Sequence, residues 1–132
     1  MRKTWIASAL LLAAVGCGGS GNSTALAARF AGTWSGTWVN TTNAADAGTS
    51  TWTIDANGNV DGHDFDAGRS TTFHVVGKID PLGSFTSVST PTTGAGASLD
   101  GPLSFGANGK LSGTLAWGVT PVLDYVYTFT KG

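Results

Sequence analysis

The chain has 132 residues, a formal net charge of −1 and a charged fraction of 11%, well below the roughly 25% of ordinary soluble domains. Its eight acidic residues are all Asp, with no Glu or Gln. Because Asp favours turns whereas Glu and Gln favour helices, this composition indicates an all-β protein. The length allows one domain, the near-neutral charge argues against a nucleic-acid partner, and one Cys excludes an internal disulfide framework or a Cys-rich metal site.

The N-terminal segment has the pattern of an export signal. Arg2 and Lys3 precede a largely apolar run at 5–15 that is too short to span a bilayer. The run leads into Ala14-Val15-Gly16-Cys17, which resembles a bacterial lipobox with Ala in place of the usual Leu. The resemblance implies that residues 1–16 are a signal peptide and that Cys17 is lipidated. The alternative is an ordinary secretory peptide with an incidental Cys.

Residues 17–28 join this Cys to a Gly- and Ser-rich stretch that is typical of a flexible tether, which leaves 29–132 as the folded domain. From Cys17 onward the chain carries five basic and eight acidic side chains, a net charge of −3, so anionic lipid does not attract it. We therefore expect an exported protein of the bacterial cell envelope, held at the outer membrane or cell surface through its lipid anchor.

Four segments of the domain repeat the pattern Gly-x-apolar-x-small, beginning at Gly32, Gly58, Gly83 and Gly109. Each of the last three glycines ends a three-residue stretch of turn composition. This stretch is Ala-Asn-Gly at Gly58 and Gly109, and Pro-Leu-Gly at Gly83. Such loops join antiparallel strands by a type I turn followed by Gly in the left-handed region. Each repeat is therefore predicted to be a β-hairpin.

Strands are predicted at 33–40, 49–55, 59–66, 71–80, 84–90, 97–106, 110–117 and 122–131. Apolar residues alternate along them with Thr, Ser, Asp, Lys and His, as an antiparallel sheet with one buried face requires. The tight turns set a register that places Trp52 opposite Gly62 and Leu103 opposite Gly113, and a large side chain over a strand glycine permits sharp curvature.

These features predict an all-β fold, an antiparallel up-and-down meander of about eight strands that closes into a barrel. The alternative is a two-sheet β-sandwich of the same hairpins. A transmembrane barrel fits less well, because spanning strands need about 9–11 residues and most of these are shorter.

Three segments resemble the avidin/streptavidin family: Gly36-Thr37-Trp38-Val39-Asn40, the hairpin from Trp52 to Gly62, and the C-terminal stretch 127–131. Together they cover less than a third of the chain after the signal. The resemblance implies an eight-stranded meander barrel that binds biotin at its open end, with Asn40 matching the Asn that contacts the ureido oxygen. The Tyr and Asp of the family's ureido site are not matched, because Asp64 and Tyr127 lie at or near those positions.

The longer loops, 41–48, 67–70, 91–96 and 118–121, share one end of the predicted barrel. The inward face near this open end presents aromatic and polar side chains: Trp38, Asn40, Asp64, Phe73, Trp117 and Tyr125. An aromatic-lined cup with a few polar groups is the usual form of a small-ligand site. The alternative is that these side chains fill a solid core. The opposite end is predicted to be closed by tight turns and large residues, namely Trp34, Ile54, Phe85, Phe105 and Phe129.

The sequence contains two candidate cation sites. The register places His63 opposite His74 on the outer face with Asp61 nearby, close enough for a shared metal; the alternative is a pair of solvated histidines. A second set matches positions 1, 3, 5 and 12 of a calcium-binding loop, although the required Gly is absent and the flanks are strands: Asp55, Asn57, Asn59 and Asp66.

The sequence contains no nucleophile motif, phosphate-binding loop or paired carboxylates, so neither an enzyme nor a cofactor is expected. The pattern favours an envelope lipoprotein whose barrel is a non-catalytic binding or structural module. Its expected partners are the membrane, through the lipid anchor, and a small molecule or an envelope protein. The alternative is a small-ligand-binding barrel of calycin or avidin type with its site at the open end.

Overall fold

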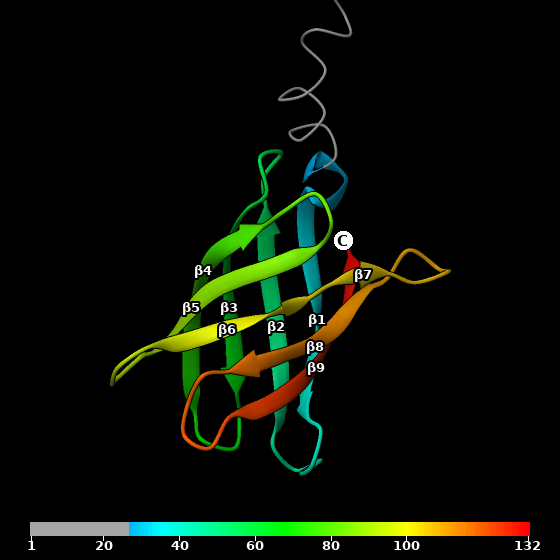
Figure 1. Ribbon diagram of the computed structural model, residues 1–132. Coiled ribbons are helices and arrows are strands. Elements are labelled where there is room, and N and C mark those ends of the chain that lie inside the picture. Colours follow the sequence, from blue (N-terminus) through cyan, green and yellow to red (C-terminus); the bar gives the residue numbers. More distant parts are fainter. Residues whose placement is uncertain (1–26) are drawn as a thin grey trace, which may run out of the picture.

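The computed structural model describes residues 27–132. The expected signal peptide, Cys17 and most of the expected tether therefore lie outside the described residues. A short 3-10 helix, η1, precedes nine strands (Figure 1), with these bounds: η1 Ala28–Phe30, β1 Gly32–Asn40, β2 Ala47–Ile54, β3 Asn59–Asp66, β4 Thr71–Ile79, β5 Ser84–Pro91, β6 Ala97–Pro102, β7 Ser104–Phe105, β8 Leu111–Trp117 and β9 Leu123–Lys131.

The sheet is an antiparallel meander that closes on itself. Strands β1 to β6 pair in sequence order, β9 pairs with both β1 and β8, and β6 pairs with β8. These eight strands form the closed barrel, and β7 adds a short extra pairing at one end of β8. The predicted all-β meander barrel is thus confirmed, and the alternative of a β-sandwich is wrong.

The three tight turns adopt the predicted geometry. Gly58, Gly83 and Gly109 have φ values of 85°, 94° and 79°, a region that favours glycine. The first two turns also dock on the neighbouring strand or its extension, since Ile79 N donates to Gly58 O and Leu103 N donates to Gly83 O, both at 2.8 Å. The β2–β3 and β4–β5 turns and η1 lie at one end of the barrel, opposite the loops β1–β2, β3–β4 and β8–β9, and the β7–β8 turn projects to the side (Figure 1).

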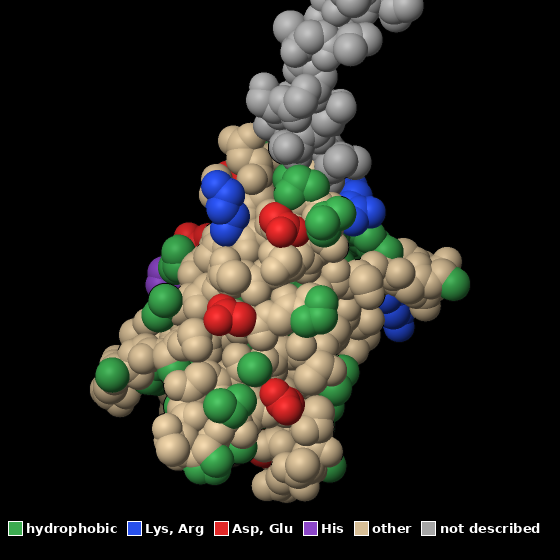
Figure 2. All heavy atoms as spheres, in the orientation of Figure 1, with side chains coloured by type: hydrophobic (Ala, Val, Ile, Leu, Met, Phe, Trp, Pro, Cys, Tyr) green, Lys and Arg blue, Asp and Glu red, His purple; other side chains and the backbone are tan. Residues whose placement is uncertain are grey.

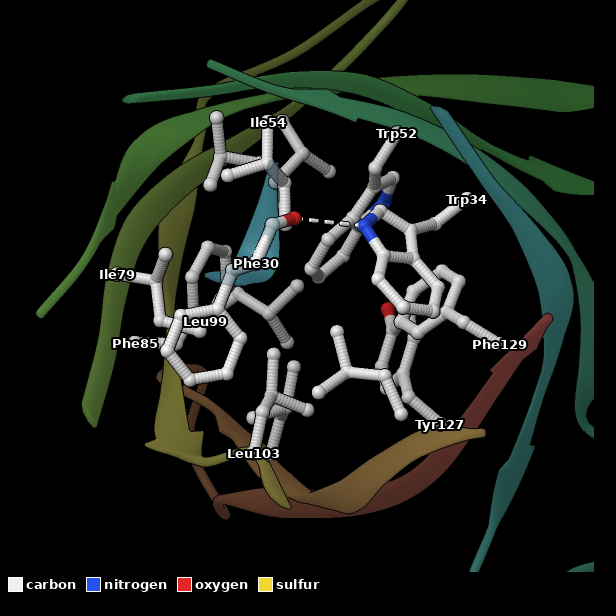
Figure 3. Packing of buried hydrophobic residues seen from close by; sticks show 14 of the residues in the cluster. Phe30, Trp34, Trp52, Ile54, Ile79, Phe85, Leu99, Leu103, Tyr127 and Phe129 are labelled. Atoms are coloured by element: carbon white, nitrogen blue, oxygen red, sulfur yellow. Dashed lines mark hydrogen bonds between the residues drawn. The ribbon is translucent and has the colours of Figure 1, made fainter. Parts of the chain in front are cut away.

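The barrel interior is packed with large side chains over its closed half. Trp52 pairs with Gly62 as predicted, and a Cβ at Gly62 would lie 2.3 Å from the Trp52 indole. Phe30 of η1 enters this end and is fully buried. Trp34 Nε1 donates to the Phe30 carbonyl at 2.8 Å, the dashed contact in Figure 3. The helix η1 therefore plugs the barrel, a role that no pattern in the sequence indicates.

One predicted strand is interrupted. The segment 97–106 divides into β6 and β7 around Leu103, after Pro102, which has no N–H to donate to the sheet. Phe105 pairs with Leu111 as predicted, but its side chain is 36% exposed and stacks on Phe30 at 5.2 Å between ring centroids. Phe105 thus lies at the rim of the closed end against Phe30, and the inward position that alternation predicts for it is wrong. Leu103 still lies over Gly113, 3.2 Å from the position of a Cβ there.

The outer face carries mostly Thr, Ser and other polar side chains, with single hydrophobic residues scattered between them (Figure 2). The aromatic side chains concentrate inside, which is the reverse of the arrangement that a transmembrane barrel needs. Within residues 27–132, no helix is long and apolar enough to cross a lipid bilayer.

Candidate functional site

A cavity of about 150 Å³ lies at the open end of the barrel. Five of the six side chains predicted for this end line it, and Asn40 does not. Asp66, Arg69 and Tyr127 also contribute to the lining. The complete lining is Trp38, Asp64, Asp66, Arg69, Phe73, Ser89, Leu99, Trp117, Leu123, Tyr125 and Tyr127. The interior is therefore filled at one end and hollow at the other.

Two edge-to-face aromatic pairs form much of the wall. Trp38 on β1 and Tyr125 on the neighbouring β9 have ring centroids 5.3 Å apart and planes at 85°. Phe73 on β4 and Trp117 on β8 meet at 5.6 Å and 88°. Since β4 and β8 are not neighbours in the sheet, the second contact crosses the barrel interior. The cavity is thus bounded mainly by aromatic ring surfaces, with geometry that aromatic pairs prefer.

Asp64 supplies a buried carboxyl group to the cavity, with a side chain only 3% exposed. Its Oδ1 accepts hydrogen bonds from Ser50 Oγ at 2.7 Å and Trp52 Nε1 at 2.8 Å, and its Oδ2 accepts one from the Tyr127 hydroxyl. Burial raises the pKa of Asp64, and the hydrogen bonds, which favour the ionised form, do not offset it. Burial, followed by the charge of Asp64, likewise raises the pKa of Tyr127.

Arg69 joins two loops at the rim of the cavity. Its guanidinium contacts the carboxylates of Asp66 and Asp46, the latter at 2.9 Å. Asp46 also accepts hydrogen bonds from Asn40 Nδ2 at 3.0 Å and the Tyr125 hydroxyl at 2.7 Å. Burial acts to raise the pKa of Asp46, but the hydrogen bonds and Arg69 outweigh it and hold the pKa below its ordinary value. Asp46 at the rim thus has a cationic partner, Arg69, whereas the hydrogen-bond donors to Asp64 are all neutral.

Asn40 has a structural role in the β1–β2 loop. Besides the bond to Asp46, its Oδ1 accepts hydrogen bonds from Thr42 N at 2.9 Å and Thr42 Oγ1 at 3.0 Å. The side chain is buried but lies outside the cavity lining. The avidin resemblance implied that Asn40 contacts a ligand. In the structure Asn40 instead holds the β1–β2 loop closed through these hydrogen bonds.

The predicted histidine pairing is present on the outer face. His63 pairs with His74, and their rings stack with centroids 4.9 Å apart and planes 13° from parallel. His74 Nε2 contacts Asp61 Oδ1 at 2.8 Å, so this nitrogen is occupied. Across residues 27–132, no three His, Cys, Asp or Glu side chains are grouped to hold a metal ion. The structure thus shows a stacked pair of surface histidines, one of which contacts Asp61.

The residues considered for calcium are divided between the two ends of the barrel. Asp55 caps the β2–β3 turn, where its Oδ1 accepts hydrogen bonds from the amides of Asn57 and Asn59, both at 2.9 Å. Asp66 lies at the far end of β3 and pairs with Arg69. Asp80 caps the next tight turn in the same way as Asp55, so the acid belongs to the turn and not to a calcium loop.

Several lining residues were not among the sequence predictions. Tyr127 and Asp66 could have been found, because they have the same inward parity as Tyr125 and Asp64 on their strands. Arg69 lies in a loop without periodicity, and its position depends on the ion pairs with Asp46 and Asp66. No local sequence pattern marks such a residue.

Comparisons of the chain with protein-family models, with curated proteins and with solved structures found no match. The candidate site is therefore defined by the geometry of this chain alone.

Proposed function

We propose that the barrel is a non-catalytic binding module that holds one small, largely apolar molecule in the cavity at its open end. The observation that carries the proposal is that five side chains predicted for this end surround a hollow instead of filling it. Apolar and aromatic walls with a few convergent polar groups are typical of small-molecule sites.

The size of the cavity limits the ligand. A volume of about 150 Å³ is similar to that of engineered cavities that accept benzene, and smaller than the roughly 300–1,000 Å³ of pockets for drug-sized molecules. We therefore expect a ligand, or the buried part of one, the size of a single substituted ring.

The position of η1 suggests how the module is attached. The described chain begins at Ala27, and η1 lies at the closed end. In this proposal, lipid on Cys17 attaches the barrel to the envelope membrane through its closed end, and the open end is free to receive the ligand.

A pair of neighbouring residues on β5 tests the cavity. Ser89 is buried and lines the cavity, whereas Thr90 is exposed on the outer face. We expect Ser89→Leu to fill the cavity and to abolish binding of ring-sized probes such as phenol and indole, measured by calorimetry and tryptophan fluorescence. Thr90→Leu adds a similar side chain outside and should bind as the unchanged protein does. Equal binding by both variants would place the ligand elsewhere and contradict the proposal.

A further inference from the structure

The carboxylate of Asp64 has an unused acceptor position. An ionised carboxylate offers about four lone-pair sites, and Asp64 uses two on Oδ1 and one on Oδ2. The open position belongs to Oδ2 of a residue that lines the cavity. A ligand with an N–H or O–H group therefore has an acceptor available at this oxygen.

No cationic side chain of the described residues contacts Asp64; His63, its neighbour on β3, lies exposed on the outer face and has only a minor electrostatic effect on it. The three hydrogen-bond donors to Asp64, Ser50, Trp52 and Tyr127, are neutral. Among the described residues that line the cavity, Arg69 is the only basic side chain. Its guanidinium group is paired with Asp46 and Asp66 and not with Asp64. Burial disfavours the ionised form of Asp64, so a cation that enters the cavity and lies beside this carboxyl group stabilises that form.

The walls of the cavity favour one kind of cation. Five aromatic side chains line it, Trp38, Phe73, Trp117, Tyr125 and Tyr127, and the faces of such rings attract organic ammonium groups. A metal ion needs several oxygen or nitrogen ligands instead, and within residues 27–132 no three His, Cys, Asp or Glu side chains come together to supply them. Apolar walls also suit the carbon skeleton of an organic ion.

We propose that the ligand of this cavity is a small organic ammonium ion, a protonated amine that carries a ring-sized apolar group, with its ammonium group against Asp64 Oδ2 and its carbon skeleton among the aromatic rings. The inference rests on the proposed binding function and adds the chemical class of the ligand. A neutral amide or alcohol also fills the acceptor position, but it leaves the charge of Asp64 unbalanced.

Two ligands of nearly the same shape separate charge from fit. Benzylamine is protonated at pH 7, whereas benzyl alcohol is neutral and has a hydroxyl at the same place. We expect calorimetric titration of the purified protein to give a Kd for benzylamine at least about tenfold lower, as a charge-dependent contact in a desolvated site implies.

Asp64→Asn should abolish this preference, because the amide has no charge. Asp124 lies on β9 near the same end with an exposed side chain, so Asp124→Asn changes the net charge equally and should keep the preference.

The possible outcomes distinguish the two proposals. If benzyl alcohol binds as tightly as benzylamine, the ammonium proposal is overturned and the binding function stands. If neither ligand nor the neutral ring probes bind, both proposals are overturned. Comparing the two ligands on the unchanged protein requires no variant, so a failure of Asp64→Asn to fold does not prevent a decision.

Discussion

The hydroxyl of Tyr127 donates a hydrogen bond to the carboxyl group of Asp64 across the barrel interior. Tyr127 lies on β9 and Asp64 on β3, two strands that are not neighbours in the sheet. Trp52 donates to the same carboxyl group and packs on Tyr127, with ring centroids 5.4 Å apart. These three residues form the boundary between the filled half of the barrel, on the side of η1, and the cavity at the open end.

Removing the cross-barrel bond should destabilise the fold. Tyr127→Phe keeps the ring but leaves Asp64 with one donor fewer, and loss of a buried hydrogen bond costs about 1–3 kcal/mol. Chemical denaturation should show a reduced free energy of unfolding. In an Asp64→Asn background the same change should cost less, because the charged acceptor is already absent; equal costs in both backgrounds would mean that the two residues are not coupled.

Replacement by alanine should cost different amounts of stability at the two tight-turn glycines Gly58 and Gly109. Both Gly58 and Gly109 have positive φ, so alanine at either position should cost about 1–2 kcal/mol of left-handed strain. A Cβ at Gly58 would also lie 2.3 Å from the Ile79 carbonyl oxygen, whereas nothing lies within 4 Å at Gly109. Thermal denaturation should therefore show Gly58→Ala to be clearly less stable than Gly109→Ala. Equal losses would contradict the docking of the β2–β3 turn on β4.

The two buried aspartates at the open end should affect stability with opposite pH dependence. The pKa of Asp46 is lowered in the folded protein, so its stabilising contribution is present above its ordinary pKa of 3.8 and is lost as the pH falls through the folded value. The destabilisation caused by Asp46→Asn should consequently be larger at pH 7 than near pH 3. Unfolding free energies at both values measure this difference, and a penalty independent of pH would count against the rim network.

The pKa of Asp64 is raised, so the sign is reversed. The contribution of a group with a raised folded pKa is fully present below its ordinary value of 3.8 and is lost as the pH rises through the folded pKa. Relative to Asp64→Asn, the unchanged protein should therefore be more stable near pH 3.5 than at pH 7. A relative stability that rises with pH would show that Asp64 is stabilised as a carboxylate and would contradict the raised pKa.

The proposed lipid anchor on Cys17 predicts that its loss changes the location of the protein. Replacing Cys17 by Ser removes the thiol that would carry the acyl chains, so the variant should leave the membrane fraction and lose the mass of the lipid. Cell fractionation and mass spectrometry measure both effects. A Cys17→Ser protein that stays in the membrane fraction would show attachment by another route.

The sequence predicted those parts of the structure that local rules govern. Alternation placed the inward aromatic side chains, the turn at Gly58 set the register that brings Trp52 over Gly62, and the loop 67–70 set the register that brings His63 beside His74. Alternation also predicted five of the residues that line the cavity, because inward side chains near the same end of successive strands lie together inside the barrel.

Features that depend on contacts distant in sequence were not predictable in this way. The plug of Phe30 depends on space left inside a closed barrel, and Arg69 depends on acids contributed by two other parts of the chain. The break at Leu103 follows Pro102, a local signal, but it also depends on tertiary structure, since the Leu103 amide bonds to the Gly83 carbonyl of the β4–β5 turn. Alternation alone therefore extended the strand too far and turned Phe105 inward.

Truncating Phe30 should cost more stability than truncating Phe105, because the two stacked rings lie in different environments. Phe30 is fully buried, and Phe105 is 36% exposed at the rim. Truncating a buried Phe to Ala costs about 3–5 kcal/mol, so Phe30→Ala should reduce the free energy of unfolding by about that amount. Phe105→Ala loses only the stacking and part of the apolar contact, about 1–2 kcal/mol. Chemical denaturation of both variants measures the difference; a Phe30→Ala protein as stable as Phe105→Ala would show that η1 is not part of the cooperative core.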